Sequence, residues 1–380
     1  MSRPIYLDCN ATTPIEPRVA AIMMRFLTEE FGNAGSRTHI YGAEAARAVN
    51  RAREQVAAVT GDESSSVIFT SGATESNNLA TFGLRKFGEA SKRKHIISTQ
   101  IEHKAVLEPI EYLRDVYGFE VTLVAPTQKG CVDPEEIGKV LRPDTLLVSV
   151  MHVNNETGVI QPLDDISERL AGHDAYFHTD ASQGFGKDLR PLRNSRIDMI
   201  SLSGHKIYGP KGVGALIARK RRFARPPLEA LAFGGGQERG LRPGTLPVAL
   251  IAALGLSAEL AVAENKTRLQ SWADFKVELM KELAPLSPHI NGEQGRVVPT
   301  TVNLSFDGLD SEAVMLALKE LVAISNGSAC TSEGHQPSHV LVAMGLTSDR
   351  VRNAVRWSWS HMTPEPDWHS IREALRKLRL

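Results

Sequence analysis

Short apolar runs alternate with helix-like stretches through the middle of the chain. Seven such apolar runs lie at 67–69, 95–97, 119–124, 146–150, 175–177, 197–202 and 213–217. Amphipathic periodicity separates many of them, as at residues 75–86 and 104–116. Parallel sheets are buried on both faces, so their strands carry continuous apolar runs. The pattern therefore predicts a doubly wound α/β domain with a mostly parallel seven-stranded sheet.

The pattern changes after about residue 258. Two helices, at 16–31 and 43–59, precede the alternating region. After it we expect a long helix to residue 283, then a strand and three further helices, at 299–306, 311–321, 337–344 and 368–378. This order is typical of a smaller α+β unit. We therefore predict a large domain of residues 16–258 and a small domain formed by residues 1–15 and 259–380.

The amino-acid composition is typical of a globular protein. With 380 residues the chain is long enough for two domains. Its 44 basic and 44 acidic residues balance, so we expect no direct nucleic-acid binding. A dense basic run at residues 219–222, continuing to Arg225, is interpreted as a solvated loop after a strand.

The three cysteines do not suggest a disulfide framework. Cys9, Cys131 and Cys330 form no CxxC pair, which argues against structural zinc and thioredoxin-like chemistry. The first residues lack a basic segment followed by an apolar one, so we expect no signal peptide. No apolar stretch approaches the length of a membrane span. We therefore expect a reducing, cytoplasmic setting and no membrane association.

Candidate chemistry begins at the strand ends, because ligands of open α/β sheets bind beyond the carboxyl ends of the strands. After the first run comes T-S-G-A-T-E at residues 70–75, which leads directly into a helix. Such residues can make an anion site from free backbone N–H groups and the helix dipole. Taken alone, however, an ordinary N-cap explains the segment better. The dinucleotide and P-loop glycine fingerprints do not occur.

Two further strand ends carry ionisable residues. Asp180 follows the run at 175–177, with Gln183 three residues on. A buried carboxylate needs a cation or donors, and a protonated pyridine nitrogen would serve, although an N-cap role explains Asp180 about as well.

Lys206 follows the run at 197–202 in a glycine-rich surround. Partial desolvation there would make a nucleophilic amine suited to Schiff-base chemistry. A surface position is commoner for any single lysine. It is disfavoured here because Asp180 and the turn at 72–74 supply the two other partners that pyridoxal phosphate (PLP) needs.

Five motifs occur in order along the chain: T-S-G-A-T-E-S-N-N from residue 70, H-V-N-N-E-T-G from 152, H-T-D-A-S-Q from 178, S-L-S-G-H-K-I-Y-G-P-K-G from 201 and S-N-G-S-A-C-T-S from 325. Together they resemble the NifS/IscS class of cysteine desulfurases, which are PLP-dependent enzymes of fold type I. The resemblance runs from Tyr6 to about Arg356. It implies a reaction that converts L-cysteine to L-alanine and leaves the sulfur as a persulfide on the enzyme.

The resemblance also implies roles for individual residues. Lys206 would hold PLP as a Schiff base and move protons on the substrate, Asp180 would pair with the ring nitrogen, and His103 would stack on the ring. Arg356 would clamp the substrate carboxylate, for which a bidentate guanidinium is suited, and Asn33 is a second candidate there. The remaining cofactor contacts would be Asn155 and Gln183 at the ring hydroxyl, and Ala73, Thr74, Ser203 and His205 at the phosphate. Thr245 would reach the phosphate from a neighbouring subunit, which implies a homodimer.

Cys330 is the cysteine that suits sulfur transfer. It lies in a polar, glycine-bearing stretch at residues 325–334 of the small domain. A thiolate there could attack the substrate sulfur and carry it away as a persulfide. A buried, inert thiol is the usual role of a lone cysteine, and it suits Cys131 and Cys9 better than Cys330.

Other functions are weighed against this one. A metal site of Cys330, His335 and His339 is disfavoured because Pro337 interrupts a helix through both histidines; we expect no metal, and a structural or substrate-side role for His339. Another fold-type-I activity, such as an aminotransferase or a selenocysteine lyase, is a second possibility, but transamination has no use for a thiol nucleophile. A non-catalytic scaffold conflicts with the intact set of predicted catalytic residues.

The downstream pathway is predicted from departures from the housekeeping sequence. The segment N-A-G-S-R-T-H at residues 33–39 is similar to DndA, the desulfurase that feeds DNA phosphorothioation. In the loop after Cys330, E-G-H-Q at residues 333–336 replaces the residues usual in the housekeeping form. The chain also ends soon after its last helix, without the tail with which IscS docks its iron–sulfur scaffold. We therefore favour sulfur transfer to an acceptor protein for DNA phosphorothioation over iron–sulfur assembly or tRNA thiolation.

Overall fold

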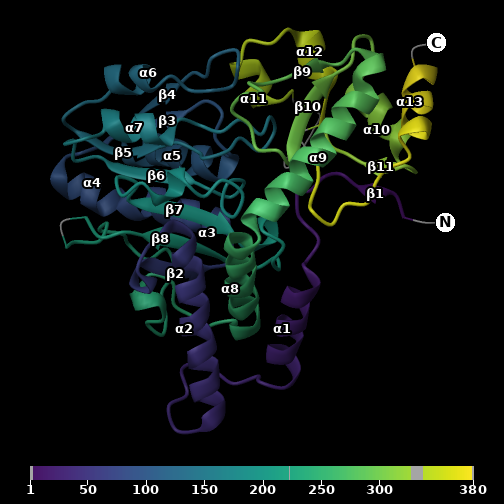
Figure 1. Ribbon diagram of the computed structural model, residues 1–380. Coiled ribbons are helices and arrows are strands. Elements are labelled where there is room, and N and C mark those ends of the chain that lie inside the picture. The colour runs from purple at the N-terminus through teal and green to yellow at the C-terminus, as the bar shows by residue number, and fades with distance from the viewer. Residues whose placement is uncertain (1–2, 222, 327–336, 379–380) are drawn as a thin grey trace.

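The computed structural model describes residues 3–221, 223–326 and 337–378. Its largest element is a seven-stranded sheet of order β2-β8-β7-β6-β5-β3-β4 (Figure 1). Of these strands only β8 runs antiparallel to its neighbours. The predicted α/β class with a mostly parallel seven-stranded sheet is confirmed. The strands are β2 Val67–Thr70, β3 His95–Thr99, β4 Glu120–Val124, β5 Thr145–Ser149, β6 Tyr176–Asp180, β7 Met199–Ser203 and β8 Gly214–Ala218.

Successive side chains of the strands enter two hydrophobic cores, one on each face of the sheet. In β2, Val67 and Phe69 lie in one core and Ile68 lies in the other. Both cores are buried, which explains why these strands appear as continuous apolar runs. The first core is built with α2 (Ile40–Thr60), α7 (Leu163–Arg169) and α8 (Val248–Ala263), and the second with α3 (Ala73–Thr81) and α5 (Lys104–Tyr117).

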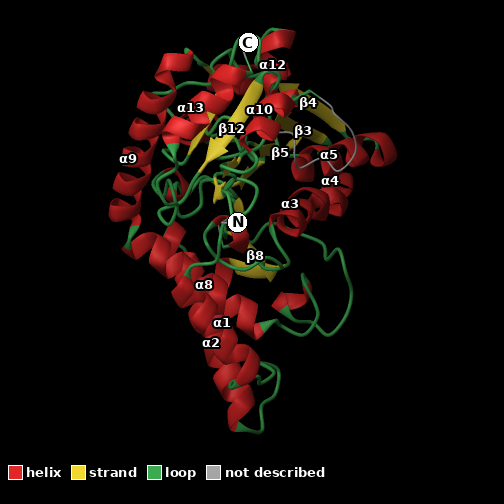
Figure 2. Ribbon diagram, turned by 90° about the vertical axis from the view of Figure 1, so that its right-hand side faces the viewer, coloured by secondary structure: helices red, strands yellow, loops and turns green. Residues whose placement is uncertain are grey.

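A second, smaller unit has its own core. Strands β12, β10 and β9 form an antiparallel sheet, and β1 pairs in parallel with β11. Trp272, Trp357 and Trp359 are buried there together with Leu7. Figure 2 shows β12 with α10 and α13 beside it and α9 along the outer edge. The elements are β1 Ile5–Tyr6, β9 His289–Ile290, β10 Thr301–Ser305, β11 Val322–Ala323, β12 Ala354–Ser358, α9 Asn265–Leu283, α10 Ser311–Leu318, α11 His339–Ala343, α12 Ser348–Arg352 and α13 Trp368–Lys377.

The helices depart from prediction at two places. A bend of 76° separates α8 from α9 at Glu264, so no single helix continues to residue 283 and the predicted boundary at residue 258 falls inside α8. The bend lets the apolar α8 pack against α1 (Pro17–Thr28) and α2 while α9 follows the smaller unit. The helix expected at 75–86 is also interrupted, because a 3-10 turn at Phe82–Leu84 separates α3 from α4 (Arg85–Ser91).

No single helix of the described chain is long and apolar enough to cross a bilayer, although α8 and α9 together, bent as they are, reach that length and apolarity.

The basic run after β8 was expected to be a solvated loop, but two of its described residues, Arg219 and Arg221, make internal contacts. Arg219 is buried, and its Nε lies 2.8 and 2.9 Å from the two carboxylate oxygens of Asp62. Arg221 donates to the carbonyl oxygen of Asp174 (2.8 Å). The expectation failed because the acidic and carbonyl partners come from distant segments that local sequence does not reveal.

Gly214, the first residue of β8, lies where three segments meet at one edge of the sheet. It pairs with Thr70 of β2 and with Ser203 of β7. A Cβ atom at Gly214 would lie 2.4 Å from the carbonyl oxygen of Leu202 and 2.6 Å from Cα of Gly72. Both are backbone atoms, so neither can rotate away. The glycine therefore lets the turn after β2 approach the end of β7.

We predict that Gly214→Ala lowers the free energy of unfolding by about 1–3 kcal/mol, the usual cost of forcing an extra methyl group into a packed site. Urea denaturation monitored by circular dichroism measures the change. Gly138→Ala in α6 (Pro134–Lys139) is the matched control, because its Cβ would meet only Cδ of Arg169 at 3.8 Å. Equal stability of the two variants would contradict the proposed close approach.

Candidate active site

A cavity of about 490 Å³ lies at the edge of the sheet where the parallel strands end. Strands β2, β5, β6 and β7 run in one direction, so their carboxyl ends meet there. The structure brings together nine of the residues predicted from sequence, although they come from widely separated segments. These are Ala73, Thr74, His103, Asn155, Asp180, Gln183, Ser203, His205 and Lys206.

Lys206 ends a short 3-10 turn that follows β7 directly. Its Nζ donates to the carbonyl oxygens of Asn10 and Ala11, the second at 2.9 Å. Both acceptors belong to the segment that precedes α1, and that segment also lines the cavity. The amine predicted to react is therefore held at a buried strand end by uncharged groups.

Asp180 ends strand β6 and is buried. Three uncharged donors hold its carboxylate: Nδ2 of Asn77 (2.7 Å), and the backbone N (2.9 Å) and Oγ (2.5 Å) of Ser182. Turns rather than a helix follow this residue, so the alternative role of Asp180 as an N-cap is wrong. A buried carboxylate whose described partners are neutral donors is suited to receive a cationic ring nitrogen.

The turn between β2 and α3 forms another part of the lining. Helix α3 begins at Ala73, so the unpaired N–H groups of its first turn lie beside Ser203 and His205. Burial, followed by the charges of Lys206 and Lys211, lowers the pKa of His205 to about 4. Its imidazole is therefore neutral at pH 7 and can act as a hydrogen-bond donor without carrying charge. This part of the cavity has the geometry of a phosphate site.

His103 is the N-cap of α5. Its Nδ1 accepts from the backbone N–H of Ala105 (3.1 Å), which assigns the ring proton to Nε2. The preceding residue, Glu102, is fully buried. Its Oε1 accepts from the backbone N of Met151 (2.7 Å) and from Oγ1 of Thr99 (3.0 Å), and its Oε2 has no partner among the described residues. Burial raises the pKa of Glu102 to about 8, so it is a neutral acid at pH 7.

Asn10 is a central site residue that the sequence analysis missed. Its carbonyl oxygen accepts from Nε2 of Gln183 (2.9 Å) and from Lys206. Its side-chain Nδ2 donates to the carbonyl oxygen of Asn155 and to Oγ1 of Thr301, both at 2.9 Å. Nothing in the irregular segment before α1 indicated this position.

Asn77 and Lys211 were also missed, although both lie inside motifs quoted for the family resemblance. Asn77 binds Asp180, and Lys211 places a cation at the rim of the cavity. Their place in those motifs was the available signal, and it was not used because no role was assigned to them.

Arg356 lies on β12, behind the cavity wall rather than in it. The residue is 0% exposed. Its Nη1 donates to the carbonyl oxygen of Asn155 (3.0 Å), and its Nη2 donates to Oδ1 of Asp8 (2.5 Å). Since Asn155 itself lines the cavity, the guanidinium contacts a lining residue without lining the cavity itself. Its role as a carboxylate clamp stays a prediction.

Two other predicted residues, Asn33 and Thr245, do not line the cavity of their own chain. Asn33 is exposed in the loop between α1 and α2, where its Oδ1 accepts from the backbone N of Gly35 (2.8 Å). Thr245 is exposed in the loop before α8. Cys330 lies outside the described residues, and its role stays a prediction.

The described residues also include His339, a candidate metal ligand, and the other two thiols, Cys9 and Cys131. His339 begins α11, with its Nε2 3.0 Å from the carbonyl oxygen of Glu102, while His335 lies outside the described residues. Within residues 3–221, 223–326 and 337–378 no group of three or more His, Cys, Asp or Glu side chains could hold a metal ion. Burial raises the pKa of Cys9 to about 12 and also raises that of Cys131, so both thiols stay protonated.

The residues present fit PLP. Asp180 offers a buried carboxylate whose described partners are neutral, and Oδ1 of Asn77 beside it is buried without a partner among the described residues. A helix N-terminus with Lys211 nearby suits the phosphate, and Lys206 suits a covalent link to the aldehyde. The volume of the cavity lies within the range usual for small-molecule sites.

Comparisons with known proteins agree with this geometry. The aminotransferase class-V family model matches residues 5–367. Cysteine desulfurase IscS of Escherichia coli is 43% identical over 380 residues, which cover 99% of this chain and 93% of the relative.

Two solved structures extend the likeness to three dimensions. DndA from Streptomyces lividans is 49% identical with a TM-score of 0.82, and the match covers 93% of this chain and 99% of that one. SspA in complex with cysteine is 37% identical with a TM-score of 0.83, covering 95% of this chain and 100% of that one.

We predict that Glu102→Gln changes how stability depends on pH. With the pKa of Glu102 raised to about 8, the folded protein keeps a proton that the unfolded chain loses near pH 4.5. The stability contributed by this group is therefore complete below about pH 4.5 and is lost as the pH rises through 8. Glutamine does not titrate, so from pH 5 to pH 9 the variant should gain about 1 kcal/mol or more relative to wild type.

Urea denaturation at pH 5, 7 and 9 measures this difference. Glu108→Gln, an exposed change on α5, is the control and should show no such trend. A constant difference between Glu102→Gln and wild type across this range would mean that Glu102 is already ionised in the folded protein.

Proposed function

The chain belongs to the aminotransferase class-V family and is a PLP-dependent cysteine desulfurase, and from this premise we propose that Lys206 and Cys330 are its catalytic residues and that its sulfur serves DNA phosphorothioation. The observation that carries the catalytic assignment is the meeting of Lys206, Asp180 and the turn at 72–74 in one cavity. Its substrate is L-cysteine, and its organic product is L-alanine.

The proposed division of labour follows from where each side chain lies. When bound, PLP supplies an electron sink that stabilises negative charge on the substrate. Asp180 keeps the ring nitrogen protonated, since an adjacent carboxylate stabilises a cation in a buried site. Lys206 would hold the cofactor covalently, and its amine would move a proton at the substrate Cα. His103, with its proton on Nε2, would cover the ring face.

Further residues are proposed to orient the cofactor. The turn at 72–74, Ser203 and His205 bind the phosphate from within the chain, and Thr245 binds it from a second subunit. Asn155 and Gln183 bind at the ring hydroxyl. Gln183 would donate the second hydrogen of its Nε2 to the ring hydroxyl, because the first is donated to the carbonyl oxygen of Asn10.

Cys330 is proposed to accept the sulfur. Its thiolate attacks the sulfur of L-cysteine, so that the sulfur–sulfur bond forms as the carbon–sulfur bond breaks. The electron pair of the broken bond stays on carbon, which takes up a proton to give L-alanine. The chain that leads to Cys330 starts beside Arg356, because Ser325 and Arg356 exchange backbone hydrogen bonds of 2.6 and 3.3 Å.

Two observations support DNA phosphorothioation as the pathway. The chain shares 49% of its residues with DndA over the matched region, compared with 43% for IscS. Residues 33–39 also have the DndA-like sequence N-A-G-S-R-T-H. We propose a cytoplasmic location, with which the free thiols of Cys9 and Cys131 agree. The second candidate is a housekeeping role in iron–sulfur assembly or tRNA thiolation, which the likeness to IscS supports.

Replacement of Cys330 by serine in the native host tests the pathway. We expect loss of phosphorothioate linkages, measured by mass spectrometry of digested DNA, with aconitase activity and thiolated tRNA unchanged.

The purified variant should stay yellow because Lys206 still binds PLP, whereas Lys206→Ala should lose the visible band. Intact phosphorothioation with lowered aconitase activity or tRNA thiolation would instead support the housekeeping role.

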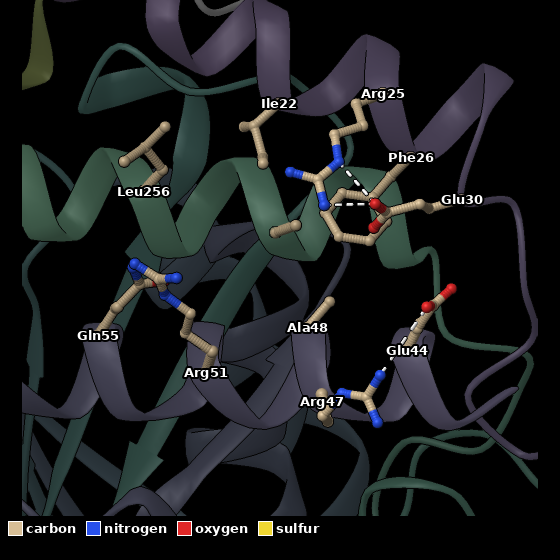
Figure 3. Close-up of a pocket in the computed structure, with 11 residues that line it drawn as sticks. Ile22, Arg25, Phe26, Glu30, Glu44, Arg47, Ala48, Arg51, Gln55 and Leu256 are labelled. Atoms are coloured by element: carbon tan, nitrogen blue, oxygen red, sulfur yellow. Dashed lines mark hydrogen bonds and ion pairs between the residues drawn. The ribbon is translucent and has the colours of Figure 1, made fainter. Parts of the chain in front are cut away.

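A homodimer is proposed from the surface of the α1–α2 hairpin, which projects from the body of the protein (Figure 1). Five large apolar side chains there expose between 49% and 68% of their surface: Met24, Leu27, Phe31, Ile40 and Tyr41. Beside them lies a groove of about 400 Å³ between α1, α2 and α8. Its floor is apolar, and its rim carries the pairs Arg25–Glu30 and Glu44–Arg47 (Figure 3). A rim with both charge signs suits a second copy related by a two-fold axis.

Met24→Arg combined with Leu27→Arg should convert the dimer to a monomer in light scattering after gel filtration. The monomer should also bind PLP more weakly, since the phosphate contact of Thr245 comes from the neighbour. Val277→Arg, at an exposed position on α9, is the matched control and should stay dimeric. A double variant that remains dimeric with normal PLP affinity would contradict this interface.

A further inference from the structure

The ion pair between Asp8 and Arg356 is not accounted for by the roles assigned above. Asp8 follows β1, and its position is fixed by the backbone on both sides. The backbone N of Ser358 donates to the carbonyl oxygen of Leu7 (2.8 Å), and the carbonyl oxygen of Ser358 accepts from the backbone N of Cys9 (3.0 Å). These two bonds hold the backbone on both sides of Asp8 against β12, the strand that carries Arg356.

The guanidinium of Arg356 has donors to spare. It offers five N–H donors, and the described side chains and carbonyls use two of them, at Asp8 and at Asn155. Nε is buried without a partner among the described residues. A carboxylate that reached this guanidinium would still find paired donors in the planar geometry that carboxylates match.

Other charged groups nearby cannot replace Asp8. Lys187 is 4% exposed, and its Nζ donates to Oε1 of Gln183 (3.2 Å). Burial, followed by the charge of Lys206, lowers the pKa of Lys187 to about 8, and the charge of Arg356 acts in the same direction, while the Cys9 thiol opposes these shifts. Burial raises the pKa of Glu156, which keeps that carboxyl closer to its neutral form. Without Asp8 the guanidinium would thus face the cation of Lys187 and the carboxyl group of Glu156, whose charged form burial disfavours.

We propose that Asp8 is the positioning residue of the substrate-carboxylate site, because it fixes the Arg356 guanidinium so that its unused donors can meet the carboxylate of L-cysteine. The inference rests on the proposed role of Arg356. Asp8 acts only through that side chain, so its contribution depends on the carboxylate and not on the amine of a ligand. An unpaired guanidinium behind the wall would reorient toward other carbonyl groups, since a buried cation without a partner is costly.

Two ligands separate this role from a general structural one. L-alanine, the product, carries both an amine and a carboxylate, whereas ethylamine is the same molecule without the carboxylate. Both are titrated into the PLP-loaded protein, and binding is followed through the visible absorption band. We expect Asp8→Ala to weaken L-alanine binding roughly tenfold or more and to leave ethylamine binding unchanged. Asp8→Asn, which keeps an acceptor oxygen, should lie between Asp8→Ala and wild type.

Asp307→Ala is the matched control, because it removes an exposed carboxylate of the smaller unit that pairs with His289. Turnover should show the same selectivity, with a raised KM for L-cysteine and little change in kcat. Equal weakening of both ligands, no weakening, or tighter binding of L-alanine would each overturn the proposal. If Asp8→Ala does not fold, Asp8→Asn carries the comparison. A wild-type protein that binds neither ligand would overturn the proposed active site as well.

Discussion

The common direction of strands β2, β5, β6 and β7 is the constraint on which the site depends. Each parallel strand needs a long crossover before the next one, so residues at the carboxyl ends are far apart in sequence but adjacent in space. Asp180 and Lys206 meet for this reason alone. The reversed strand β8 then brings the small residue Gly214 to the same edge, where a larger residue would push away the turn that begins α3.

Burial favours the neutral forms of several ionisable groups near the cavity. It drives Glu102 and His205 toward their neutral forms at pH 7, and it lowers the proton affinity of Lys187. Asp180 and Arg356 instead have close hydrogen-bond partners, at Asn77 and Ser182 for the first and at Asn155 and Asp8 for the second. A site with few competing charges gives each charged part of a ligand a single opposite partner, which fixes orientation more firmly than a field of mixed charges would.

The sequence was sufficient for the seven strands of the large sheet, the fold class and nine of the residues that line the cavity, because strand ends and local motifs carry that information. It was insufficient where distant segments decide the outcome. Asn10 comes from an irregular segment with no periodicity, yet it contacts Gln183 and Lys206. Arg219 was expected in solvent because its partner Asp62 is remote. The bend at Glu264 follows from the packing of two units, which helical periodicity does not report.

The contacts of the first residues also set an order of assembly during synthesis. Asp8 and Asn10 find their partners Arg356 and Ser358 some 348 residues later in the chain. A ribosome adds about 5–20 residues per second, so these early residues wait for roughly 20 to 70 seconds before their partners emerge. The large sheet can form in the meantime, but one wall of the cavity is completed only near the end of translation. A truncated product would therefore lack both a finished pocket and the strand that carries Arg356.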